Sequence, residues 1–116
     1  MSDFGTTISV IKENTGSFEN SEIKKLSDKL KEFIYDEELE NVLGEAYNNE
    51  FKRVDGENKP TLLVQLSEHF YSGEEDQDEE TFEFVKDTEL DDAELLISKL
   101  KTLFNHYSFE ARVEEW

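Results

Sequence analysis

The run TLLVQLS at residues 61–67 constrains the fold more than any other part of the chain. Leu62, Val64 and Leu66 lie on one side of an extended chain, and polar residues such as Gln65 lie on the other. This alternation predicts an interior β-strand, because successive side chains in a strand point to opposite faces. The apolar face of such a strand has to be covered by other elements of the same chain.

Other segments also read as strands. TTISVI is β-branched at nearly every position, and TFEFVKD places Phe82 and Phe84 on one face. SFEARVEEW alternates apolar and charged residues. The run HFYSGEEDQDEE is expected to connect a wide antiparallel hairpin. The predicted strands are residues 6–11, 61–67, 81–87 and 108–116, with a short run at 51–54 that ends at the turn signal Asp55-Gly56.

Two segments, residues 21–34 and 89–107, carry apolar residues at helical spacing and are predicted helices. Asn20 or Ser21 is the expected N-cap of the first helix. Residues 36–48 are interpreted as a third, short helix. The apolar stripes are Ile23, Leu26, Leu30 and Phe33 or Ile34 in the first helix, and Ala93, Leu96, Ile97, Leu100, Leu103, Phe104 and Tyr107 in the second.

The resulting order of strands and helices predicts an α+β fold. It is the order of a split βαβ or ferredoxin-like sandwich, with two main helices on one face of a four- or five-stranded antiparallel sheet. The whole chain, residues 1–116, is expected to form a single domain. The other face of the sheet is expected to be polar and to meet water. That face is predicted to carry Thr7, Ser9, Gln65, Ser67, Glu83, Glu110 and Arg112.

Charge limits the partners of the chain. Thirty acidic residues against 12 basic ones give a formal net charge of −18. Such a charge repels phosphate backbones and anionic lipid, so we expect no direct binding to nucleic acid or membranes. The start MSDFGTTISV lacks the basic and apolar segments of a signal peptide, and no stretch is long and apolar enough for a membrane helix. We therefore expect a cytoplasmic protein.

No catalytic signature is present. The chain has no cysteine, and its two histidines, His69 and His106, stand in no recognisable motif. The five glycines are scattered singly, so there is no glycine-rich phosphate loop. We predict that the protein is not an enzyme and binds no cofactor.

The stretch GEEDQDEE at residues 73–80 invites comparison with a calcium loop, because Asp76, Asp78 and Glu80 alternate. An EF-hand loop also requires glycine at its sixth position and glutamate at its twelfth. Counting from Asp76, those positions hold Thr81 and Asp87. We therefore expect no metal site here.

The acidity is concentrated at residues 74–94, which hold 12 acidic residues and one basic residue, Lys86. A concentrated negative field attracts a cationic partner. We predict a surface that binds a basic protein, of the kind found in immunity proteins, inhibitors and imitators of nucleic acid. A solvated turn without a partner and a small-molecule-binding regulatory domain of a homodimer stay as alternatives, and the sequence leaves the oligomeric state open. The predicted partner-binding residues are Glu74, Glu75, Asp76, Asp78, Glu79, Glu80, Asp91 and Asp92.

Overall fold

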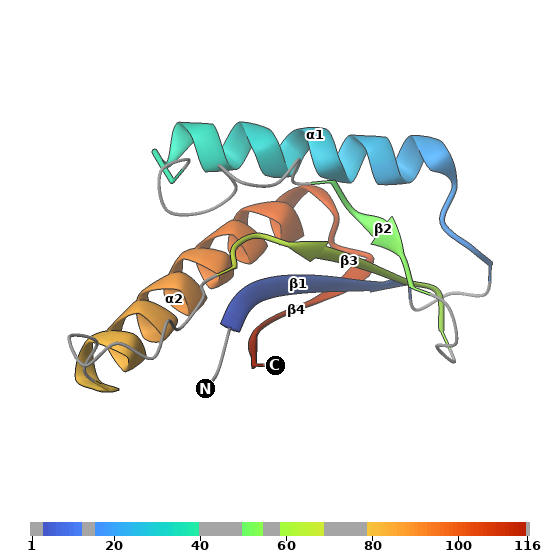
Figure 1. Cartoon of the computed structure of the whole chain (residues 1–116). Coiled ribbons are helices and arrows are strands. Elements are labelled where there is room, and N and C mark those ends of the chain that lie inside the picture. Colours follow the sequence, from blue (N-terminus) through green and yellow to red (C-terminus); the bar gives the residue numbers. More distant parts are fainter. Residues whose placement is uncertain (1–3, 13–15, 40–49, 55–58, 69–78, 116) are drawn as a thin grey trace.

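A computed structural model of the chain describes residues 4–12, 16–39, 50–54, 59–68 and 79–115 (Figure 1). These residues form four strands and two helices. In chain order the elements are β1 (Phe4–Lys12), α1 (Asn20–Asp36), β2 (Lys52–Arg53), β3 (Thr61–Gln65), α2 (Glu79–Leu103) and β4 (Tyr107–Glu115).

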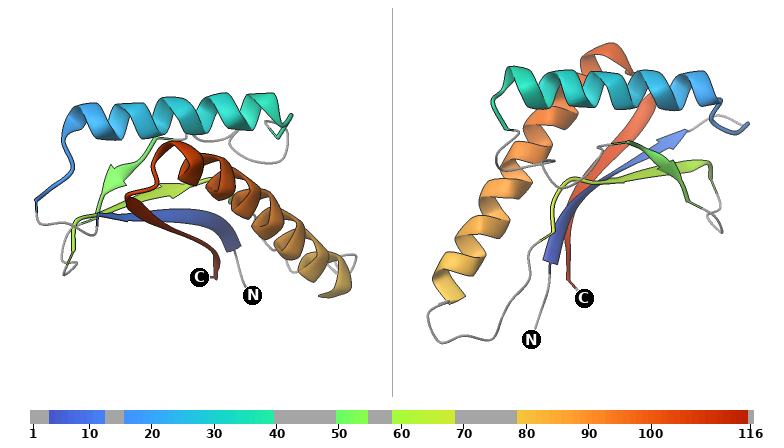
Figure 2. Two further views of the ribbon diagram at one scale, coloured as in Figure 1. Left: turned by 180° about the vertical axis from the view of Figure 1, so that it is seen from behind. Right: turned by 45° about the horizontal axis from the view of Figure 1, so that its top comes forward.

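The four strands form one sheet in the order β2-β3-β1-β4, and every pair of neighbours is antiparallel. Both helices lie on the same side of this sheet (Figures 1 and 2). The predicted α+β class, with two helices and a four-stranded antiparallel sheet, is therefore confirmed. β1 occupies an interior position, because it pairs with β3 along one edge and with β4 along the other.

The core lies between the sheet and the helices. Even-numbered residues from Phe4 to Val10 in β1, and Leu62 and Val64 in β3, face the helices and are almost fully buried, whereas odd-numbered residues lie on the open face. Thr7 and Ser9 are nevertheless buried on that open face. Each is small, and its neighbours across the sheet are longer side chains, such as Gln65 and Arg112 beside Thr7. The buried apolar residues of the sheet and the two helices include Ile8, Val10, Leu62, Val64, Leu26, Leu30, Ile34, Leu96, Ile97 and Leu100.

The strand predicted at residues 81–87 is wrong, since this segment belongs to α2. The same residues fit two periods: Phe82 and Phe84 alternate as in a strand, while Phe82, Val85 and Glu89 recur at helical spacing. The helical period continues into the strong apolar pattern from Ala93 onwards, so one long helix forms. The predicted hairpin between residues 61–71 and 81–87 is therefore also wrong.

Two smaller corrections concern single side chains. Leu103, expected in the buried stripe, ends α2 and is 53% exposed. Ser67 and Glu83, expected on the open face of the sheet, lie elsewhere: Ser67 follows β3 and is buried, and Glu83 belongs to α2. Of the predicted third helix, residues 40–48 lie outside the described residues, and Asp36 is the last residue of α1.

The first helix begins after a break at Gly16, whose φ of 116° favours glycine. Its N-cap is Glu19, one residue before the first of the two predicted caps. The backbone N–H of Glu19 donates a hydrogen bond to the Glu22 carboxylate at 3.0 Å, as in a capping box. Lys12 Nζ, from the end of β1, lies 3.0 Å from the same carboxylate. The hydroxyl of Tyr107, at the start of β4, also donates to Glu22.

These contacts shift two pKa values. The hydrogen bond from Tyr107, followed by those from Glu19 and Lys12, lowers the pKa of Glu22 from 4.5 to about 2. Burial and the neighbouring Glu22 carboxylate raise the pKa of Tyr107. In its ionised form Glu22 therefore holds the start of α1 against one end of the β1–β4 pair, where Lys12 lies opposite Tyr107.

The opposite placements of Leu100 and Leu103 give a test of the helix. Leu100 is fully buried, so Leu100→Ala should lower the free energy of unfolding by about 2–5 kcal/mol through lost burial and a cavity. Leu103→Ala, at an exposed position one turn later, should change it by less than about 0.5 kcal/mol. Urea denaturation measures both. Equal losses in the two variants would contradict the described end of α2.

The lowered pKa of Glu22 predicts a pH dependence. Its contribution to stability is complete above about pH 4.5 and is lost as the pH falls towards 2. Wild type should therefore exceed Glu22→Gln by on the order of 1–2 kcal/mol at neutral pH, and the two should converge below about pH 2. Urea denaturation at stepped pH measures this, with Glu32→Gln, an exposed position on α1, as the control. A difference that does not vary with pH would refute the proposed role of Glu22.

Candidate functional site

The first part of α2 is the most acidic element of the described structure. Residues 79–94 contain eight acidic residues and a single basic one, Lys86. They run along the helix that extends beyond the sheet in Figure 1. The acidic concentration predicted for residues 74–94 therefore lies largely on a helix rather than at the tip of a hairpin.

One acidic residue of this segment points inward. Glu89 is only 1% exposed, and its Oε2 accepts hydrogen bonds from Thr6 Oγ1 and Ser67 Oγ, both at 2.9 Å. Ser67 Oγ in turn accepts from the backbone N–H of Thr6 at 3.2 Å. Each residue turns a helix by about 100°, so positions two before and two after Glu89 point away from the sheet. Glu89 thus fixes the side on which Asp87 and Asp91 are displayed.

Four carboxylates line the outward side of α2 and are named here the acidic face: Glu83, Asp87, Asp91 and Glu94. All four are exposed, and successive members are four, four and three residues apart. Like charges at this spacing destabilise a helix by about 0.2–0.5 kcal/mol per pair. Glu83 lies 3.4 Å from Lys86 Nζ. Within the described parts of the chain, no side chain forms an ion pair or hydrogen bond with Asp87, Asp91 or Glu94.

Exposed apolar side chains flank the acidic face. Phe84, beside Glu83 and one turn before Asp87, is 70% exposed, and Leu95, one turn after Asp91, is 40% exposed. Removal of apolar groups of this size from water by a partner stabilises the complex. The helix therefore offers both charge and apolar contact area on neighbouring positions.

Asp92 lies at the border between the acidic face and the core. It is partly buried, and burial is the main reason why its pKa is raised. The charges of Asp91 and Glu89 raise the pKa further. Asp92 is therefore less suited than its exposed neighbours to meet a partner.

The predicted partner-binding residues are only partly placed by the structure. Glu79 and Glu80 form the first turn of α2 through their backbone, Asp91 is exposed on the acidic face, and Asp92 is partly buried. Four further predicted residues lie outside the described residues: Glu74, Glu75, Asp76 and Asp78.

The sequence-based list omitted Asp87 and Glu94. Both belong to the acidic face because they recur with Asp91 at helical spacing. A helical reading of residues 79–94 would have shown this, but Asp87 was assigned to a strand. The same helical spacing puts Glu89 in line with Ala93 and Leu96, whereas its hydrogen bonds to Thr6 and Ser67 have no signal in the sequence.

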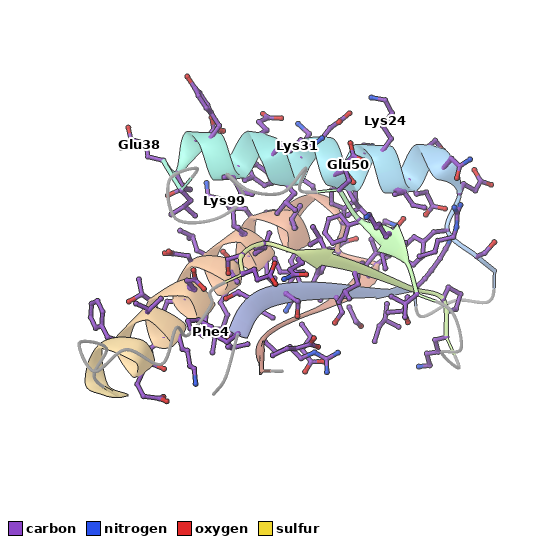
Figure 3. The ribbon with its side chains drawn as sticks, in the orientation of Figure 1. Phe4, Lys24, Lys31, Glu38, Glu50 and Lys99 are labelled. Atoms are coloured by element: carbon purple, nitrogen blue, oxygen red, sulfur yellow. The ribbon has the colours of Figure 1, made fainter. Side chains whose placement is uncertain are left out.

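The charges of α1 contrast with those of α2. Three of its lysines have acidic partners: Lys24 with Asp28 at 3.0 Å, Lys29 with Glu32 at 3.1 Å, and Lys31 with Glu50 at 3.3 Å. Figure 3 shows Lys24 pointing away from the sheet on the outer side of α1. Local pairs of this kind are typical of a solvated helix face.

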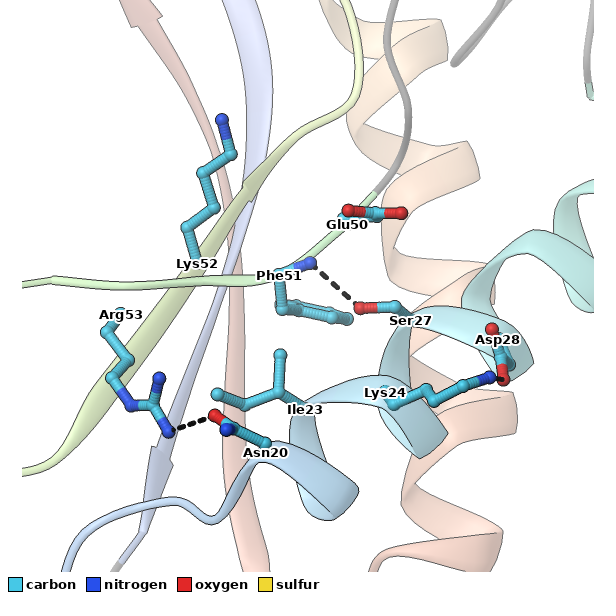
Figure 4. A pocket seen from close by; sticks show the side chains of 9 residues that line it. All are labelled: Asn20, Ile23, Lys24, Ser27, Asp28, Glu50, Phe51, Lys52 and Arg53. Carbon is cyan, nitrogen blue, oxygen red and sulfur yellow. Dashed lines mark hydrogen bonds and ion pairs between the residues drawn. The ribbon is translucent and has the colours of Figure 1, made fainter.

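A hollow of about 550 Å³ lies between α1 and β2 (Figure 4). Several of its polar groups already bind one another. Phe51 N–H donates to Ser27 Oγ at 3.0 Å, and Arg53 Nη2 donates to Asn20 Oδ1 at 2.7 Å. The hollow mixes both signs of charge and is lined by Asn20, Ile23, Lys24, Ser27, Asp28, Glu50, Phe51, Lys52 and Arg53.

Other classes of site find little support in the described residues. No group of three or more His, Cys, Asp or Glu side chains among them is arranged to hold a metal ion. Neither described helix combines the length and apolar character needed to cross a membrane. His69 lies outside the described residues, and His106 is exposed with its ring against Tyr107. Comparison with known families, curated proteins and solved structures gives no significant match.

The raised pKa of Asp92 predicts a gain in stability on neutralisation. The ionised form is disfavoured in the fold, so Asp92→Asn should be more stable than wild type at neutral pH. The gain should disappear below about pH 4, where the unfolded chain also binds the proton. Asp91→Asn should give a smaller gain, because Asp91 is exposed. Urea denaturation at both pH values tests this, and an equal or larger gain in Asp91→Asn would contradict burial as the main cause.

Proposed function

We propose that this protein is a non-enzymatic interaction module that binds a basic protein through the acidic face of α2. The observation that carries the proposal is the row of exposed carboxylates at Asp87, Asp91 and Glu94, which have no partner among the described side chains. The net charge of the chain, −18, also favours a positively charged partner. A cationic surface would relieve the repulsion along the row.

The arrangement supports binding in two physical stages. The field of the acidic face accelerates encounter with a positively charged surface, and this effect weakens as salt is added. Short-range contact then involves Phe84 and Leu95, which are exposed on neighbouring positions. Aromatic residues placed in this way often carry much of the binding energy of an interface.

The spacing of the acidic face suggests the class of partner. Residues four apart on a helix are separated by about 6 Å along its axis. A regular row of negative groups resembles the backbone of a nucleic acid, which basic proteins bind mainly through charge. We therefore propose an immunity-like or inhibitor-like role, in which the acidic face occupies the nucleic-acid-binding surface of a basic protein.

We also propose that the fold is ferredoxin-like. The chain order β-α-β-β-α-β and the sheet order β2-β3-β1-β4 support this assignment. The alternative function, a small-molecule-binding regulatory homodimer, draws on the hollow between α1 and β2 alone. Most of the polar groups that line it already pair with described neighbours, so the acidic face is preferred.

Two triple variants with equal change in charge test the acidic face. Asp87→Lys/Asp91→Lys/Glu94→Lys reverses three of its four carboxylates, and Asp28→Lys/Glu32→Lys/Asp36→Lys reverses two aspartates and one glutamate exposed on α1. Each immobilised protein is exposed to lysate of its own host at low salt and at about 0.5 M salt, and retained proteins are identified. Wild type and the α1 variant should retain a common basic protein at low salt, and the α2 variant should lose it.

Far-ultraviolet circular dichroism establishes that both variants fold. Equal loss in the two variants would show that overall charge, rather than the acidic face, governs retention. Failure of wild type to retain any basic protein would count equally against the proposal.

A further inference from the structure

The outer edge of β4 has no strand beside it in the described part of the fold. β4 pairs with β1 over nine residues, from Phe4 opposite Glu115 to Lys12 opposite Tyr107, with no interruption. No other described strand pairs with it. Natural proteins usually blunt such edges with short strands, charges or bulges, because the free N–H and C=O groups invite another strand. The opposite edge, β2, is blunted, since it is two residues long and both are basic.

The side chains of β4 fall into two rows. Glu110 and Arg112 are exposed on the open face of the sheet, next to each other in that row. Phe109, Ala111 and Val113 are on the helix side and only partly buried. Phe109 and Ala111 pack against the edge of the core. The apolar layer is therefore incompletely covered along this edge.

We propose that two copies of this chain associate through β4, as antiparallel strands related by a two-fold axis at Ala111. In this register Glu110 of each copy lies opposite Arg112 of the other, and Phe109 lies opposite Val113. The first pair joins opposite charges and the second joins apolar side chains, both of which stabilise antiparallel sheets. The two four-stranded sheets would become one continuous eight-stranded sheet.

Other registers fit less well. In an antiparallel pair, two opposed residues either both point their N–H and C=O groups at the partner strand or both point them away. A two-fold axis between identical strands therefore has to pass between the two copies of one residue. An axis at Glu110 or Arg112 places identical charges opposite one another. An axis at Val113 pairs Arg112 with Glu114 but leaves residues 107–110 unpaired. Ala111 is the midpoint of β4, so that axis alone pairs all nine residues.

Space and charge are compatible with this pairing. A hollow of about 390 Å³ adjoins the start of β4, lined by Lys101, Asn105, Tyr107, Ser108 and Phe109. In the proposed register, residues 107–109 lie opposite residues 113–115 of the second copy, so this hollow leaves room for the side chains of the second copy. Repulsion between two acidic chains is screened beyond about 8 Å at physiological ionic strength, whereas opposed side chains in a sheet are closer than that.

A cysteine placed on the axis tests the register directly, because the chain contains no cysteine. Opposed Cα atoms in an antiparallel pair are about 4.5–5.5 Å apart, which suits a disulfide. Ala111→Cys should therefore form a covalent dimer on mild oxidation at about 0.15 M salt. Ser108→Cys is the matched control, since its two copies would lie about 20 Å apart along the strands. Non-reducing electrophoresis measures both.

Charge exchange gives a second, reversible test. Glu110→Arg and Arg112→Glu each place two like-charged pairs across the axis, and each should weaken the dimer about tenfold or more. The combined variant restores opposite charges and should recover the wild-type association. Sedimentation equilibrium measures the association constants, and circular dichroism checks folding at these exposed positions.

Three results would overturn the dimer: a wild-type chain that stays monomeric up to about millimolar concentration, cross-linking of Ser108→Cys as fast as Ala111→Cys, or a combined variant no tighter than the single ones. None of these results bears on the acidic face, which belongs to α2, so the two proposals stand or fall separately.

Discussion

The burial of the Glu89 carboxyl group is the interaction on which the rest of the arrangement depends. A buried carboxyl group without donors costs free energy, so the hydroxyls of Thr6 and Ser67 have to reach it. The three residues come from β1, from the segment after β3 and from α2. Their contacts fix α2 in rotation and position against the sheet. Only residues 104–106 separate α2 from β4, so the same tie also guides the last strand to its place beside β1.

Much of the fold follows from local patterns. In most elements the apolar residues recur at the spacing of a strand or of a helix but not of both, and residues typical of turns or caps flank the element. The alternation around Val64 and the stripe of Leu26 and Leu30 each have one reading, and both elements form where expected. Residues 81–87 fit two periods, and the choice is made by the helix that continues beyond them. Leu103 fits the apolar stripe but lies at the end of α2, where the core no longer covers it. Such outcomes depend on neighbours that are distant in sequence.

The candidate site was predictable as a charge distribution but not as a surface. Counting carboxylates places the acidity correctly at residues 74–94, and Asp91 is displayed as expected. Which acids face water depends on the inward orientation of Glu89, and that depends on Thr6, 83 residues away. Asp92 illustrates the limit, since its partial burial sets it apart from the adjacent Asp91 although the two are chemically identical.

The interior position of β1 has a consequence for the synthesis of the protein. β1 leaves the ribosome before the other described strands, yet its partner on one side is β4, formed from residues 107–115. Until those residues emerge, one edge of β1 stays without its strand. Hydrogen bonds between β1 and β3 can form earlier, whereas the β1–β4 pair has to wait for residues 107–115. During that interval the nascent chain presents an open edge of β1, to which chaperones have access.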